Sequence, residues 1–184
     1  MDTIAVSPPL FGPPILPVAT MPADRPSAVA LVLDVSSSMC GDQRIIDLFK
    51  ESLVSWFAKM EYDNILHFAG QWHEDPGNAV AAIHGFVQPV RNLSASIADA
   101  TKALSTLDRV YRRKALLVTD QFSVRDTHVM KMAINRAESH LLDIVFHAVA
   151  YGPLYSRLVA ECGWNFHHLD EPKEIEPLLM EVCK

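Results

Sequence analysis

Short apolar runs alternate with amphipathic segments along most of this chain. Buried strands are continuous apolar stretches, whereas helices place apolar residues three or four positions apart. We therefore expect strands over 28–34, 64–68, 85–90, 115–119, 144–150 and 165–169. The helical spacing predicts helices over 43–60, 96–107, 126–142, 155–162 and 174–182. This alternation predicts an α/β, Rossmann-like doubly wound fold, with helices flanking a mostly parallel central sheet. The turn-forming residues of Asp75-Pro76-Gly77-Asn78 indicate a loop between the second and third strands.

The first 27 residues differ from the rest of the chain. Seven of the 12 prolines fall there, which excludes a persistent helix or a central strand. The prolines are interleaved with apolar residues that a solvated linker would not carry, namely Leu10, Phe11, Ile15, Leu16 and Val18. We therefore divide the chain into a proline-rich extended N-terminal arm, residues 1–27, and one domain, residues 28–184. We expect the arm to dock on its own domain, on a neighbouring subunit or on a partner.

Composition and charge limit the kind of partner. Hydrophobic residues make up 49% and charged residues 21% of the chain, as in soluble globular proteins. A formal net charge of -6 argues against binding to nucleic acid. No apolar run reaches ~18 residues and no basic leader precedes an apolar core, so we expect neither a membrane span nor a secretory signal. Three cysteines without paired spacing indicate reduced thiols and a cytoplasmic location.

A cluster of oxygen-bearing side chains follows the first predicted strand. Asp34 ends the apolar run, and Ser36 and Ser38 follow at intervals of two, which in an extended loop turns all three side chains the same way. Asp120 follows the strand expected over 115–119, and the carboxyl ends of parallel strands meet at one edge. Carboxylate and hydroxyl oxygens suit Mg²⁺, Mn²⁺ or Ca²⁺. The alternative is a turn in which Asp and Ser begin a helix.

Three segments resemble one known family. The motif DVSSSM (34–39) resembles the DxSxS metal-ion-dependent adhesion site (MIDAS) of von Willebrand factor type A (vWA) domains. LLVTDQ (116–121) is similar to the family's second aspartate segment, and NLSASIADATKAL (92–104) to the loop and helix that carry its threonine. The resemblance covers about residues 28–182. It implies that the following residues hold the ion, directly or through water: Asp34, Ser36, Ser38 and Asp120.

Two positions depart from the family's pattern. Ala95 stands where the family has its threonine, so it offers no oxygen, and Gln121 replaces the usual glycine. Ser94 or Ser96 can supply the missing oxygen after a shift of one residue, and water can also fill the position. We include Ser96 in the expected ligand set.

The resemblance implies a non-enzymatic protein-binding module that uses the ion to engage an Asp or Glu of a partner. Such proteins serve as adaptors or as subunits of larger assemblies, often beside MoxR-type AAA+ ATPases. One alternative is a structural assembly subunit with a degenerate metal site. The other is a Mg²⁺-dependent phosphatase-like hydrolase with Asp34 as nucleophile, but its DxDx pattern needs an acid where Ser36 stands.

The eight histidines show no common metal-binding spacing. His67 and His147 fall within predicted strands, where we expect them to be satisfied core or edge residues. His167 and His168 are adjacent in a strand and point to opposite faces, so they do not readily share an ion.

Overall fold

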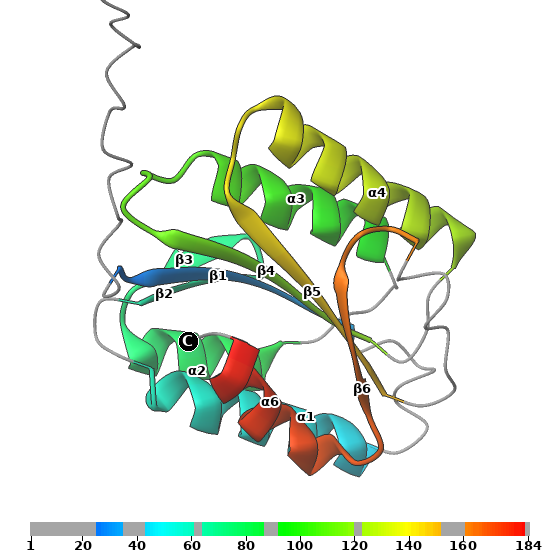
Figure 1. Ribbon diagram of the computed structural model, residues 1–184. Helices are drawn as coiled ribbons and strands as arrows, with labels where there is room; N and C mark the ends of the chain where they lie inside the picture. The colour runs from blue at the N-terminus through cyan, green and yellow to red at the C-terminus, as the bar shows by residue number, and fades with distance from the viewer. Residues whose placement is uncertain are drawn as a thin grey trace, which may run out of the picture.

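The computed structural model describes residues 25–34, 43–60, 64–86, 92–119, 123–151 and 161–182. Its middle layer is a six-stranded sheet with the order β3-β2-β1-β4-β5-β6 (Figure 1). The strands are β1 (Ser27–Leu33), β2 (Ile65–Phe68), β3 (Gln71–His73), β4 (Arg112–Thr119), β5 (Ile144–Tyr151) and β6 (Asn165–Leu169). All neighbouring strands are parallel except β2 and β3. The expected α/β fold is therefore confirmed.

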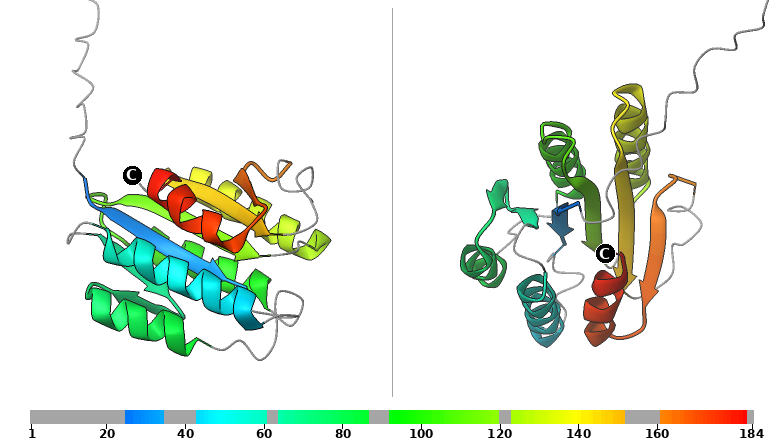
Figure 2. Two further views of the ribbon diagram at one scale, coloured as in Figure 1. Left: turned by 90° about the horizontal axis from the view of Figure 1, so that it is seen from below. Right: turned by 60° about the vertical axis from the view of Figure 1, so that its left-hand side comes forward.

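Helices cover both faces of this sheet (Figures 1 and 2). One face packs against α3 (Leu93–Ser105) and α4 (Val124–Ser139). The other face packs against α1 (Gln43–Ala58), α2 (Pro76–Gly85) and α6 (Ile175–Val182), and a 3-10 turn (Pro172–Glu174) leads into α6. The sheet thus has an apolar core on each side.

The central strand β1 shows why the apolar runs are continuous. All seven of its residues are buried. Ala28, Ala30 and Val32 belong to the core beneath α3 and α4. Val29, Leu31 and Leu33 belong to the core beneath α1, α2 and α6. A strand covered on both faces needs apolar residues at successive positions, so it does not show the alternation of a half-exposed strand.

The segment after β2 differs from the sequence-based expectation. Asp75 does not lie in a long loop but caps α2, because its Oδ1 accepts a hydrogen bond from the Asn78 amide at 2.9 Å. Pro76 occupies the first turn, where its missing N–H costs nothing. The helix runs to Gly85, so the strand expected over 85–90 is wrong at its start. Residues 87–90 lie outside the described part of the chain.

A short antiparallel strand, β3, was also missed. It pairs with β2 at the sheet edge through a two-residue turn. Both turn residues have positive φ, 50° at Ala69 and 81° at Gly70, which matches the twist of tight hairpins. An alanine at such a position is unusual, so the sequence carries a weak hairpin signal here.

Other expectations hold within a few residues or cannot be compared. The helices expected over 96–107 and 126–142 begin and end two or three residues earlier, as α3 and α4. The helix expected over 43–60 ends at Ala58. Most of the helix expected over 155–162 lies outside the described residues, as do residues 1–24 of the arm.

β1 and β4 lie side by side at the middle of the sheet, and the strand order reverses between them. The chain passes from β1 outward to β2 and β3, and then returns to β4 and proceeds outward to β5 and β6. In open α/β sheets, ligands bind beyond the carboxyl ends of the strands at such a switch point. Asp34 follows β1 at this edge.

Candidate metal centre

Asp34 lies beside β4 at the switch point. Its backbone amide donates to the carbonyl oxygen of Val118 at 2.8 Å, which extends the β1–β4 ladder by one residue beyond Leu33. The side chain of Asp34 is also fully removed from solvent, with 0% exposed. The sheet itself therefore fixes the backbone that carries this carboxylate.

Thr119, the last residue of β4, binds the same carboxylate. Its Oγ1 donates to Asp34 Oδ2 at 2.6 Å, and Thr119 is 0% exposed. A buried carboxylate is costly unless it is hydrogen-bonded, and a bond of this length is typical of a hydroxyl donating to a charged oxygen. Thr119 is not among the residues predicted from the sequence. The available signal was a β-branched hydroxyl immediately before Asp120, at the end of a neighbouring parallel strand.

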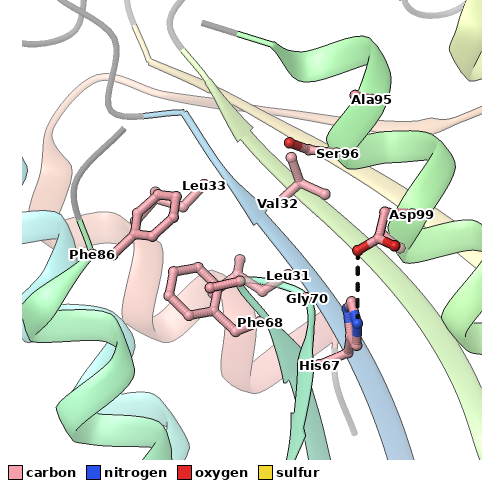
Figure 3. Close-up of a pocket in the computed structure, with 12 residues that line it drawn as sticks. Leu31, Val32, Leu33, His67, Phe68, Gly70, Phe86, Ala95, Ser96 and Asp99 are labelled. Atoms are coloured by element: carbon pink, nitrogen blue, oxygen red, sulfur yellow. Dashed lines mark ion pairs between the residues drawn. The ribbon is translucent and has the colours of Figure 1, made fainter. Parts of the chain in front are cut away.

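A pocket of about 270 Å³ opens beside the end of β1 (Figure 3). Val32 and Leu33 line one side, and Ala95 and Ser96 of α3 line another. The geometry thus brings Ser96 to the same pocket as the residue that precedes Asp34. Ala95 contributes a methyl group there and no ligand oxygen.

The two serines that flank Ala95 have different surroundings. Ser96 Oγ donates to the Asn92 carbonyl oxygen at 3.2 Å. A hydroxyl that donates its hydrogen still has oxygen lone pairs that can accept or coordinate. Ser94 Oγ instead donates to Asp126 Oδ1 of α4 at 3.4 Å, and Ser94 does not line the pocket. Ser96 is therefore the better placed of the two.

Asp126 has a structural role at the start of α4. Its Oδ2 accepts hydrogen bonds from the backbone N–H and the hydroxyl of Ser123, at 2.8 and 2.7 Å. The Asp126 amide in turn donates to Ser123 Oγ at 3.1 Å, which completes a capping box at the start of α4. Ser123, rather than Asp126, is the N-cap residue.

The structure describes two of the five residues expected to hold a metal, Asp34 and Ser96. Ser36, Ser38 and Asp120 lie outside the described residues. Within the described ranges, no group of three or more His, Cys, Asp or Glu side chains could hold a metal ion. The expected ligand set relies on serine oxygens and on a second aspartate from outside those ranges, so its assembly stays a prediction.

A histidine of β2 and an exposed aspartate of α3 line the same pocket. His67 Nε2 lies 3.9 Å from Asp99 Oδ2, and the Asp99 side chain is 57% exposed (Figure 3). Burial lowers the pKa of His67, while Asp99 acts in the opposite direction. His67 also packs edge-on against Trp72. His67 is therefore a buried core residue, and Asp99 is an exposed residue of α3.

No protein-family model matches this sequence, and none of the curated proteins does. Proximal thread matrix protein 1 (PTMP1) from the mussel byssus has a similar structure, with a TM-score of 0.64 and 10% identity over 86% of this chain and 47% of that one. A second PTMP1 structure, with a TM-score of 0.63 and 10% identity over the same shares of the chains, is described as having a zinc occupied MIDAS motif.

Two other solved structures extend the likeness. The pilus adhesin SpaC from Lactobacillus rhamnosus GG matches with a TM-score of 0.65 and 10% identity, over 89% of this chain and 31% of that one. The SpRpn10 VWA domain matches with a TM-score of 0.56 and 12% identity, over 84% of this chain and 94% of that one. This chain thus spans less than half of PTMP1 and of SpaC, but nearly all of the SpRpn10 domain.

These matches define the architecture: the chain has a vWA-like fold. At about a tenth of residues identical, the likeness concerns fold alone. Among the helices that the structure describes, none has the length and apolar character needed to cross a membrane.

Proposed function

We propose that this protein is a protein-binding module that works through a divalent metal ion. The observation that carries the proposal is the buried Asp34 carboxylate at the switch point, held by Thr119. Its oxygens, with the hydroxyls of Ser36 and Ser38 and the carboxylate of Asp120, are hard donors that suit Mg²⁺, Mn²⁺ or Ca²⁺. Ser96 supplies a further oxygen from α3.

The ion would supply an electrophilic position for a partner's carboxylate. Two carboxylates and neutral hydroxyls leave a hexacoordinate ion with positions for water or for an incoming ligand. A partner that presents Asp or Glu would replace that water. Two similar structures support this proposal, because PTMP1 has a zinc occupied MIDAS motif and SpaC is a pilus adhesin. We further propose a cytoplasmic adaptor or assembly subunit, with an AAA+ ATPase as one partner, and no catalytic activity of its own.

One observation favours a second candidate, a structural assembly subunit with a degenerate metal site. Ala95 lines the pocket at the family's threonine position and has no oxygen to offer. If the remaining donors bind no ion, the same edge of the sheet would serve as a contact surface without metal.

Thermal unfolding with and without Mg²⁺ distinguishes these candidates. A ligand that binds only the folded state stabilises it by about 2.7 kcal/mol at one hundred times its dissociation constant. We expect Mg²⁺ to raise the melting temperature of the wild-type protein, and chelation to reverse the rise. Asp34→Ala should abolish the metal-dependent shift, whatever its effect on the starting stability.

Asp99→Asn is the matched control, because Asp99 is a carboxylate of the neighbouring pocket and is not in the expected ligand set. It should keep the wild-type shift. If Mg²⁺ raises the melting temperature of Asp34→Ala as much as that of the wild-type protein, the metal site does not include Asp34. No shift in the wild-type protein would favour the structural subunit.

A further inference from the structure

Two histidines far from the pocket meet across β5 and β6. His147 Nδ1 lies 3.1 Å from His167 Nε2, and the rings are stacked with centroids 5.4 Å apart and an interplanar angle of 27°. In the strand register, His147 is opposite Asn165 and His167 is opposite Val149. The two histidines are therefore diagonal neighbours on one face, held by the backbone of two parallel strands.

The surroundings keep both rings neutral near neutral pH. His147 is 8% exposed, and burial lowers its pKa to about 4, with smaller contributions from His167 and Lys114. Burial also lowers the pKa of His167, while Glu181 acts in the opposite direction. A neutral imidazole has one nitrogen with an accessible lone pair and one N–H. The pair is thus an N–H···N hydrogen bond between two potential metal ligands.

We propose that His147 and His167 form a two-histidine site for a borderline transition-metal ion such as Zn²⁺ or Ni²⁺. Imidazole nitrogen suits these ions, unlike Mg²⁺. The two nitrogens are 3.1 Å apart, and a bond from Zn²⁺ to imidazole nitrogen is about 2.0–2.1 Å long. These distances give an N–metal–N angle of about 100°, which lies between the octahedral and tetrahedral angles. Both rings must turn so that their lone pairs converge. The proton between them moves to the outer nitrogen of the ring that carried it, so both rings stay neutral.

The charges around the pair act in opposite directions. The Glu181 carboxylate of α6 favours a cation near His167, whereas the Lys114 ammonium disfavours one near His147. The Lys114 ammonium also donates a hydrogen bond to the Val182 carbonyl oxygen at 2.9 Å. Water would complete the coordination shell, since the described residues contain no group of three metal-ligating side chains. This predicts modest affinity.

This site is separate from the one at Asp34. His147 lies three residues before Ala150, and Ala150 is in register with Thr119 at the strand end. His147 also lies two strands away from β1. The two sites therefore differ in position and in ligand chemistry, so an experiment can disprove one proposal without affecting the other.

Titration calorimetry of the full chain with Ni²⁺ alone tests the proposal. Loss of one of two ligands should weaken binding at least about tenfold in His167→Gln and in His147→Gln. His167 is half-buried, so His167→Gln decides the outcome if the more buried His147→Gln fails to fold. His168→Gln, at the next position on the opposite face, should bind Ni²⁺ like the wild-type protein. The proposal is overturned if the wild-type protein takes up no Ni²⁺, or if His167→Gln binds it as tightly.

Discussion

Thr119 donates its hydroxyl hydrogen to Asp34 Oδ2 across the junction of β1 and β4, with 2.6 Å between the oxygens. Both residues are fully buried. The bond joins two parallel strands at the position where a ligand site is expected. The carboxylate is therefore oriented by the sheet itself.

Thr119→Val should destabilise the protein by about 1–3 kcal/mol, because it leaves a buried carboxylate with one donor fewer at nearly the same volume. Urea unfolding at neutral pH in the presence of chelator measures this change. Thr101→Val is the matched control, since the buried Thr101 hydroxyl donates only to a helix carbonyl, that of Ile97, at 2.8 Å. If both variants lose the same free energy of unfolding, the bond from Thr119 to Asp34 stabilises the protein no more than the bond from Thr101 to its helix carbonyl.

Acid should destabilise the folded protein through His147. In the unfolded chain an imidazole binds a proton below its ordinary pKa of 6.5, but burial lowers the pKa of His147 to about 4 in the folded protein. Between these values the unfolded chain binds more protons, so stability falls as the pH falls, by up to about 3 kcal/mol. His147→Gln should lose less stability over the same pH range in urea unfolding. Parallel pH profiles for the two proteins would refute this assignment.

Ala95→Thr should strengthen binding of Mn²⁺ by about tenfold, because it adds a hard oxygen at the pocket wall. The electron paramagnetic resonance signal of unbound Mn²⁺ measures the affinity. Ala98→Thr serves as control, since Ala98 is an exposed position of the same helix that does not line the pocket. If affinity is unchanged in both variants, the oxygen at this position already comes from Ser96 or from water.

Removal of residues 2–24 should leave the domain folded but weaken assembly or partner binding. The described chain begins at Arg25, whose Nε donates to the Val110 carbonyl oxygen at 2.8 Å. The Pro26 carbonyl oxygen accepts from the Arg112 amide, also at 2.8 Å. Deletion of residues 2–26 removes these two contacts and should lower the melting temperature, unlike the shorter deletion. Hydrogen exchange that finds the arm unprotected both alone and in a complex would disprove docking.

The parts of the fold that the sequence predicts well are those set by local pattern. β1 and β5 are mostly apolar, and β4 ends in an apolar run that the sequence analysis placed at 115–119. The apolar residues of α3 and α4 recur at helical spacing. Burial against the sheet explains both patterns. The missed helix α2 begins with Asp75 and Pro76, which occur both in turns and at helix starts. Only packing of its apolar face on the sheet decides between these two structures.

The candidate site shows the same limit. Asp34 is recognisable because a carboxylate ends an apolar run, which is local information. Its bond to Thr119 depends on the register between β1 and β4, and the pair of His147 and His167 depends on that between β5 and β6. Neither register can be read from residues 85 and 20 positions apart in the chain. Contacts of this kind appear only when the strand order is known.

The most direct test of the central claim is calorimetric titration of the full chain with Mn²⁺. The account predicts one bound ion per chain in the wild-type protein and in Asp99→Asn, and no measurable binding in Asp34→Asn. It also predicts tighter apparent Mn²⁺ binding in the presence of acetate than in its absence, because acetate can fill the open position as a partner's carboxylate would. Equal binding of Mn²⁺ by the wild-type protein and by Asp34→Asn, or no binding by either, would contradict the account.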